Sequence, residues 1–243
     1  MTMDEQNLYS VSDHLSNIEL YYTAPDRCLD NEVSIFGDDF QHITKVMRHK
    51  TGDRIYVTNG MGKIFIGNLN TISKGSISIT ILNQIEYKNY FENIFICIPK
   101  LKSQERFEFA LEKCTELGIT NFIVFESERT ISKSIRLERW DKIVISAMKQ
   151  SLRSFKPNIK TLNSIKNIFE LEGEKIVFEQ NSRNIFSKKN INFHEKIFFI
   201  FGPEGGLTEN EINLFDKYNS YNLAGNRLRT ETAIVKCASI LSV

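Results

Sequence analysis

The chain has 243 residues, of which 41% are hydrophobic and 25% are charged, and its formal net charge is +1. This length suits one large domain or two small ones with a substantial core, and the composition excludes a fibrous or disordered chain. No apolar run approaches the roughly 20 residues of a membrane-spanning helix, and the N-terminal residues lack the basic and apolar parts of a signal peptide. We therefore expect a cytoplasmic protein without a membrane segment.

Residues 1–17 are predicted to form an N-terminal extension, and residues 18–90 a small β-rich domain. Four segments rich in β-branched and aromatic residues indicate strands, and turn residues separate them. The expected strands are residues 18–24, 53–59, 63–69 and 75–85. The NGMGK segment between the second and third of these is typical of a hairpin connection. These short strands favour a β-barrel-like module.

One helix is expected within this first domain, between Asp38 and Gly52. Asp38 is the candidate N-cap, and Gly52 lies just beyond the expected end. The helical spacing predicts an apolar face made of Phe40, Ile43, Val46 and Met47.

Residues 91–243 have a different pattern, in which short apolar runs alternate with helical segments. The runs at 93–98, 121–125, 175–179 and 196–201 are nearly continuous, as in strands covered on both faces. Helices are predicted at 103–118, at 138–152 with Trp140, Ile143, Val144 and Ala147 buried, and at the C-terminus with Ala233, Ile234, Cys237, Ala238 and Leu241 buried. The alternation predicts an α/β domain with a mainly parallel sheet.

The four cysteines, Cys28, Cys97, Cys114 and Cys237, are scattered without a Cys-x-x-Cys pair, and the four histidines lack metal-ligand spacing. We therefore expect no metal site. Three of the cysteines fall in apolar patterns, so we interpret them as buried thiols.

The segment FIFGPEGGLTENE, residues 199–211, joins a predicted strand to a helix start. Thr208 and Glu211 have the spacing of a capping box, and the glycines allow a ligand to approach the backbone closely. Such a turn usually suggests phosphate, but the Glu204 carboxylate disfavours an anion. The segment also lacks the Gly-Lys-Ser/Thr ending of a P-loop, so a nucleotide hydrolase is disfavoured. A purely geometric connection remains the alternative.

A second candidate segment is LAGNRLRTETA, residues 223–233. Arg227 and Arg229 immediately precede the C-terminal helix, where the helix dipole disfavours positive charge. Their position therefore indicates a functional role, and a surface pairing of Arg229 with Glu231 is the alternative.

Basic residues concentrate between Arg129 and Lys160. This stretch contains nine of them, namely Arg129, Lys133, Arg136, Arg139, Lys142, Lys149, Arg153, Lys156 and Lys160. The stretch favours a polyanionic partner, although a solvated face is the alternative.

Five motifs together carry a resemblance to a known family. In this order along the chain, HITKVMRHKTGDRIYV, EKCTELGI, QSLRSFKP, FGPEGG and LRTETA resemble the RsmE family of ribosomal RNA uridine N3-methyltransferases, within the SPOUT superfamily. The resemblance covers about residue 18 to the C-terminus. It implies an N-terminal PUA-like RNA-binding β-barrel over residues 18–90 and a SPOUT methyltransferase domain with a deep trefoil knot over residues 91–243. It also implies a homodimer that methylates N3 of a uridine in 16S rRNA of the small ribosomal subunit.

The resemblance further implies S-adenosylmethionine as the cofactor and assigns three sets of residues. The cofactor-binding residues would be Phe178, Glu179, Gly202, Pro203, Glu204, Gly205, Gly206, Leu223, Gly225, Asn226 and Leu228. The RNA-binding residues would be Lys45, Arg48, Lys100, Lys102, Arg153 and Arg227. Arg229 would stabilise the uracil anion, and Glu231 would either accept the proton or hold the arginines. A cationic methyl donor also makes Glu204 acceptable beside the ligand.

Two other functions stay open at the level of sequence. An RNA-binding ribosome-assembly protein without catalysis would bind RNA but not S-adenosylmethionine. An RNA methyltransferase could also act on a different nucleotide, although C5 methylation normally needs a cysteine nucleophile, and no cysteine here is well placed for one.

Overall fold

The computed structural model describes residues 15–130, 135–214 and 219–242. Most of the predicted N-terminal extension, as well as Lys133, lies outside these residues. The chain forms two compact units, one comprising residues up to Asn89 together with Met148–Lys156, the other Tyr90–Ala147 together with Pro157–Val243. The sequence-based boundary placed the Met148–Lys156 segment in the second domain. In the described residues, no helix has the length and apolar character needed to cross a membrane.

The first unit is built on a five-stranded sheet with the order β1-β3-β4-β5-β2. Its strands are β1 (Leu20–Tyr22), β2 (Glu32–Phe36), β3 (Arg54–Thr58), β4 (Lys63–Ser73) and β5 (Ser76–Glu86). β1 and β3 are parallel and the other pairs are antiparallel, with β3 and β4 forming the expected hairpin. At the two sheet edges, the Thr23 hydroxyl donates to the Ser34 carbonyl at 2.6 Å.

The helix of the first unit differs from the prediction. It consists of α2 (Gly37–Gln41) and a π-helical turn, η2 (His42–Val46), and Asp38 is not its N-cap. Ile43 is buried and Phe40 is partly buried as expected, but Val46 and Met47 are 65% and 41% exposed. The wider π turn breaks the 3.6-residue spacing on which the predicted apolar face depended. The chain then leaves the helix at Arg48, whose φ is 57°.

Residues 148–156 pack onto the β3–β4 hairpin of the first unit. Gly62 N–H donates to the Ser154 carbonyl at 2.9 Å, and Lys156 N–H donates to the Gly60 carbonyl at 2.8 Å. At Gly62 a Cβ atom would lie 2.5 Å from the Phe155 ring, so this contact requires glycine. In the same unit Lys149 Nζ lies 2.5 Å from Asp39 Oδ1.

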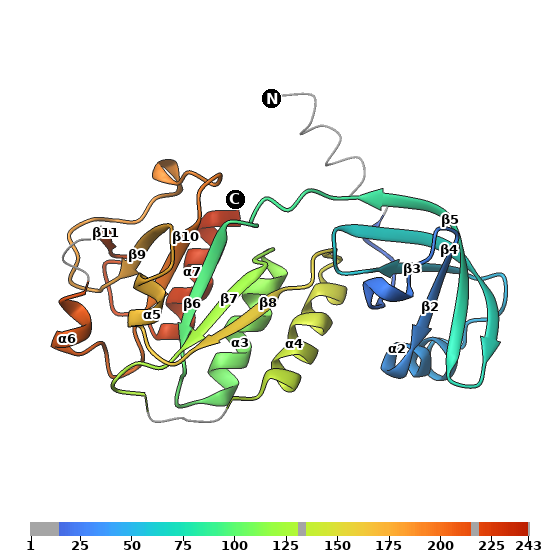
Figure 1. Ribbon diagram of the computed structural model, residues 1–243, viewed down its shortest axis with the longest axis horizontal. Coiled ribbons are helices and arrows are strands. Elements are labelled where there is room, and N and C mark those ends of the chain that lie inside the picture. Colours follow the sequence, from blue (N-terminus) through green and yellow to red (C-terminus); the bar gives the residue numbers. More distant parts are fainter. Residues whose placement is uncertain (1–14, 131–134, 215–218, 243) are drawn as a thin grey trace. The chain divides into compact units, whose positions relative to one another are not determined.

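The second unit is built on a six-stranded, all-parallel sheet with the order β11-β9-β10-β6-β7-β8 (Figure 1). Its strands are β6 (Ile94–Pro99), β7 (Asn121–Phe125), β8 (Asn158–Leu162), β9 (Glu174–Phe178), β10 (Ile197–Phe201) and β11 (Asn219–Tyr221). The predicted parallel sheet is confirmed, as are the four apolar strands. The sequence patterns missed β8 and β11, the two edge strands, because neither has a continuous apolar run.

Helices cover both faces of this sheet. Alternate strand residues pack against α3 (Gln104–Glu116), α4 (Leu137–Gln150) and α7 (Thr230–Ser242) on one face, as the core residues of these elements form a single cluster. The other face packs against α5 (Lys166–Phe169) and the segment before α6 (Glu209–Ile212). The three-residue 3₁₀ helices η1 (Pro25–Arg27) and η3 (Lys188–Asn190) complete the described elements.

The apolar helix faces are largely as predicted. Trp140, Val144 and Ala147 of α4 are buried, and Ile143 is partly buried against the same core. The thiols of Cys97, Cys114 and Cys237 are buried, as expected, and burial raises their pKa values. A nucleophilic thiolate at any of these three positions is therefore disfavoured.

Candidate functional site

A cavity of about 610 Å³ opens at the carboxyl edge of the parallel sheet in the second unit. Its wall includes the end of β9, the turn after β10, the chain after β11 and the start of α7. Loops after parallel strands meet at this edge, which is where open α/β sheets bind ligands. Nine of the predicted cofactor residues line it, namely Phe178, Glu179, Gly202, Pro203, Glu204, Gly206, Leu223, Asn226 and Leu228.

Two of the predicted cofactor residues do not line the cavity. Gly205 is exposed and presents its carbonyl to Arg129, and Gly225 is exposed with open space around its Cα. Neither glycine therefore contributes to the cavity wall.

The Gly202–Gly206 turn is held from three directions. Thr230 Oγ1 donates to the Gly202 carbonyl at 3.0 Å, and Arg129 Nη1 donates to the Gly205 carbonyl at 2.8 Å. The Glu204 carboxylate accepts from the Lys102 N–H at 3.2 Å. Within the turn, Gly206 has a φ of 71°, a conformation that favours glycine. The turn is thus a tethered wall, and Glu204 both shapes it and faces the cavity.

The predicted capping box follows this turn and is confirmed. Thr208 Oγ1 accepts from the Glu211 N–H, and Glu211 Oε2 accepts from the Thr208 N–H at 2.9 Å. Glu211 is buried, and its Oε1 also accepts from the Glu128 N–H at 3.0 Å. One carboxylate therefore caps α6 and fastens the loop after β7 to the turn.

The Leu223–Arg229 loop forms the opposite wall and brings two arginines to the cavity. Arg227 and Arg229 line it, and both are exposed. Among the described residues, neither side chain has a hydrogen-bond or ion-pair partner, so the predicted surface pairing of Arg229 with Glu231 is absent there. Their guanidinium groups are available to a ligand in the cavity.

Glu231 lies beside the cavity without lining it. It is buried at the start of α7, and its Oε1 is 3.6 Å from Nε of Arg106 on α3. Arg106 itself lines the cavity. The structure thus places Glu231 next to an arginine other than the two that the sequence had grouped with it.

Glu179 is the titratable group in the cavity with a shifted pKa. Burial raises the pKa of its carboxyl above the ordinary glutamate value. A desolvated carboxylate is stabilised by a nearby cation or hydroxyl donor, so this group favours a ligand carrying one of these.

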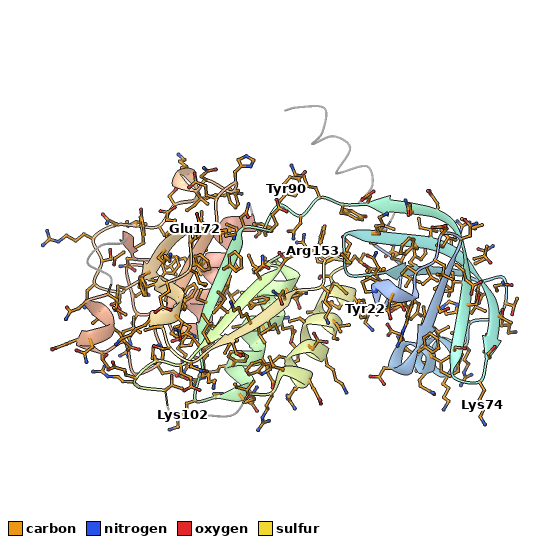
Figure 2. The ribbon with its side chains drawn as sticks, in the orientation of Figure 1. Tyr22, Lys74, Tyr90, Lys102, Arg153 and Glu172 are labelled. Carbon is orange, nitrogen blue, oxygen red and sulfur yellow. The ribbon has the colours of Figure 1, made fainter. Side chains whose placement is uncertain are left out.

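The predicted RNA-binding residues are distributed over both units. Lys45, Arg48 and Arg153 are exposed in the first unit, and Lys102 is exposed just before α3 in the second. Figure 2 labels Arg153 and Lys102. Lys100 corrects the prediction, because its side chain is only 4% exposed and Nζ lies 2.5 Å from Glu126 Oε1. A buried, paired ammonium is not available to a phosphate on the surface.

Several cavity residues were not assigned to the site from the sequence. They are Arg106, Gln180, Asn181, Phe201, Tyr221, Asn222, Ala224, Thr230 and Ala233. Phe201, Thr230 and Ala233 lie within recognised motifs, whereas Arg106 is one charge of an amphipathic helix and becomes informative only through its place in the fold. In the described part of the chain, no three His, Cys, Asp or Glu side chains gather in a way that could hold a metal ion.

Comparison with known proteins gives two family matches. Residues 89–242 match the family described as an RNA methyltransferase domain, and residues 36–82 match the family described as an RNA methyltransferase PUA domain.

Individual relatives agree with these matches. The chain is 28% identical to the ribosomal RNA small subunit methyltransferase E of Rickettsia conorii, over 85% of this chain and 87% of the relative. It is 29% identical to the protein of the same name from Bacillus subtilis, over 86% and 89%. A crystal structure of the Neisseria gonorrhoeae protein bound to S-adenosyl methionine superposes with a TM-score of 0.77, at 27% identity, covering 92% of this chain and 96% of the other.

Proposed function

Because the chain belongs to the RNA methyltransferase domain family, whose model matches residues 89–242, we propose that it is an S-adenosylmethionine-dependent ribosomal RNA methyltransferase. Its substrate is N3 of a uridine in 16S rRNA of the small ribosomal subunit. The observation that carries the proposal is the cavity at the carboxyl edge of the matched domain, formed by the FGPEGG turn and the LRTETA segment. The names of the relatives support the ribosomal RNA substrate, and the motifs of the resemblance support uridine N3.

The cavity fits S-adenosylmethionine in size and chemistry. Its volume of about 610 Å³ lies within the range of roughly 300–1,000 Å³ for small-molecule sites. Phe178, Leu223 and Leu228 supply apolar surface for an adenine ring. The carboxylates of Glu179 and Glu204 suit a cationic ligand, and the raised pKa of Glu179 reflects a desolvation cost that a cation would offset. When bound, the cofactor supplies a methyl group on a positively charged sulfur.

The chain's own residues orient the uracil and stabilise its charge. Loss of the N3 proton leaves negative charge on the uracil oxygens, and fixed donors aimed at this charge lower the barrier. Arg229 supplies such donors from the cavity wall, and its side chain has no competing partner among the described residues. Arg227, two positions before Arg229 in the same loop, binds the neighbouring RNA phosphate.

The RNA surface comprises exposed cations on both units. Lys45, Arg48 and Arg153 on the first unit and Lys102 and Arg227 on the second are all exposed. The match of residues 36–82 to the RNA methyltransferase PUA domain supports RNA binding by the first unit. Neutralising these cations should flatten the salt dependence of RNA binding, since each phosphate contact contributes to its slope.

Four finer features complete the proposal. By the family resemblance, the second unit contains a deep trefoil knot, the five-stranded sheet of the first unit forms a PUA-like barrel, and the protein is a homodimer that acts in the cytoplasm. The Thr23–Ser34 hydrogen bond between the sheet edges is consistent with the barrel.

The test is nucleoside mass spectrometry of 16S rRNA from cells with and without the gene. We expect N3-methyluridine to disappear from one position in the deleted strain and to return when purified protein and S-adenosylmethionine are added to the small subunit. Unchanged N3-methyluridine would contradict this target. Protein that binds RNA but not S-adenosylmethionine would support the assembly-protein alternative.

A further inference from the structure

Arg106 and Glu231 form a pair at the edge of the cavity that joins two helices. Arg106 is the third residue of α3, and Glu231 is the second residue of α7. Arg106 Nε lies 3.6 Å from Glu231 Oε1, and the two side chains are 40% and 9% exposed. The buried residues of α3 and α7 belong to one hydrophobic core cluster, so packing fixes the two helices that carry the pair.

Glu231 is buried and lies outside the cavity wall, so it is poorly placed to exchange a proton with a ligand. It does not line the cavity, and within the described residues its Oε2 is buried without a hydrogen-bond partner. The preceding residue, Thr230, fixes the start of α7 by donating to the Gly202 carbonyl. A buried carboxylate beside one cation depends strongly on that cation. Its position therefore favours holding the arginine over exchanging a proton with a ligand.

Arg106 can donate hydrogen bonds from the cavity wall. A guanidinium carries five N–H groups, and Nε of Arg106 lies 3.6 Å from Oε1 of Glu231. The side chain lines the cavity together with Glu204 and Arg229. A guanidinium is a planar fork of N–H donors, and this geometry suits carboxylate and phosphate groups.

We propose that Arg106 is an anion-binding residue of the cavity and that Glu231 is the positioning residue that orients it. This inference deepens the proposed function and rests on it. The ligand group is a carboxylate or a phosphate, which can come from the amino-acid end of S-adenosylmethionine or from the target nucleotide. Glu231 is accordingly not the proton acceptor of the reaction.

The test compares Arg106→Gln, Arg106→Lys and Glu231→Gln with Lys113→Gln as the matched control. Lys113 lies two turns further along α3, is ion-paired with Glu112 and Glu116, and does not line the cavity. Calorimetry gives the affinity of each full-length variant for S-adenosylmethionine, and filter binding gives its affinity for a 16S rRNA fragment. Steady-state methylation then gives kcat and KM over a range of about pH 5 to pH 9.

We expect Arg106→Gln to lower the affinity for one of the two ligands by about 10- to 100-fold, the loss that corresponds to a charge-assisted hydrogen bond. A lower affinity for S-adenosylmethionine would show that Arg106 binds the carboxylate of the methyl donor. A lower affinity for RNA would show that it binds a phosphate of the target nucleotide. Arg106→Lys should retain part of the affinity that Arg106→Gln loses. Glu231→Gln should lower the affinity for the same ligand by a smaller factor than Arg106→Gln does. The double variant should lose less than the sum of the two single losses, and Glu231→Gln should keep the wild-type shape of the pH profile.

Two outcomes overturn the inference. One is that Arg106→Gln binds both ligands as well as Lys113→Gln does. The other is that Glu231→Gln removes the low-pH limb of the pH profile, where activity rises as a general base loses its proton, which would make Glu231 the proton acceptor. Wild-type protein that binds both ligands without methylating the RNA would contradict the proposed function instead, while the affinities would still decide the role of Arg106.

Discussion

The two walls of the cavity differ in how they are held. The Gly202–Gly206 turn is fixed by contacts from the loop after β7, from the chain before α3 and from the start of α7. Among the described residues, the Leu223–Arg229 loop has only local bonds: the Ala224 N–H donates to the Asn222 side chain at 3.0 Å, and the Ala233 N–H donates to the Arg229 carbonyl at 2.9 Å. Its two arginines have no partner among the described residues. One wall is therefore built as a fixed surface and the other offers unpaired charge, which suggests that changes to the first affect folding and changes to the second affect the reaction.

Replacing Arg229 on the unpaired wall should give the largest effect. We expect Arg229→Gln to lower kcat by about 100- to 1,000-fold at saturating cofactor and RNA, the cost of removing a donor aimed at developing charge. The melting temperature should stay unchanged, because Arg229 is exposed and has no partner among the described residues. Near-normal kcat would contradict its proposed role.

Removing the carboxylate behind the fixed wall should cost stability. Glu211→Ala deprives the Thr208 and Glu128 N–H groups of their acceptor, so we expect a loss of about 2 kcal/mol in the free energy of unfolding. Chemical denaturation measures it, with Glu209→Ala, an exposed residue of the same helical turn, as the control. Equal losses in the two variants would show that the tether is unimportant.

A matched pair of glycine substitutions compares the walls directly. Gly206→Ala should destabilise the protein by about 1–2 kcal/mol because its φ of 71° strains an L-residue. Gly225→Ala should change stability by less than about 0.5 kcal/mol, since open space surrounds that residue. The comparison fails if both variants unfold at the same denaturant concentration.

Loosening the fixed wall at Arg129 should have a smaller effect. Arg129→Gln loses the hydrogen bond to the Gly205 carbonyl, so we expect affinity for S-adenosylmethionine to fall by about 3- to 10-fold. Arg136→Gln is the control, because Arg136 is also an exposed cation of the basic stretch and, like Arg129, does not line the cavity. Calorimetry of both variants measures the difference, and equal affinities would show that the bond from Arg129 to the turn does not affect cofactor binding.

Glu179 predicts a modest pH effect at the site itself. Its folded-state pKa is raised by burial, so ionising it costs stability as pH rises from the ordinary glutamate value through the raised one. A cationic ligand needs the ionised form, so affinity for S-adenosylmethionine should increase over the same interval. Glu179→Gln should stabilise the unliganded protein slightly and remove this pH dependence. Persistence of the dependence in that variant would assign it to another group.

Sequence patterns predict the parts of the molecule that depend on local physics. The four apolar strands of the second unit, the Thr208–Glu211 capping box and the buried thiols follow from periodicity and spacing. The family resemblance grouped the predicted cofactor residues, and nine of them line one cavity. Val46 and Met47 were wrong because a π-helical turn changes the angular spacing, which residue types do not reveal.

The missing parts of the site depend on long-range pairing. The side chain of Lys100 is buried and ion-paired with Glu126, which directly follows the neighbouring strand β7. Arg106 lines the cavity and Arg129 contacts the Gly202–Gly206 turn, and the partner of each lies more than 70 positions away in the sequence. No window of local sequence contains both members of such pairs, so only the folded chain identifies them.

The contact of Gly62 with Phe155 has a consequence for how this protein can be divided or recombined. A fragment cut at residue 90 would lack the Met148–Lys156 segment, and the hairpin would lose the backbone bonds at Gly60 and Gly62. A chimaera that joins the first unit to a distant relative's catalytic half would also inherit a foreign partner for this hairpin. A fusion protein that uses the first unit therefore has to include both of its segments, the residues up to Asn89 and Met148–Lys156. We also expect substitutions in the hairpin and at Phe155 to be correlated in evolution.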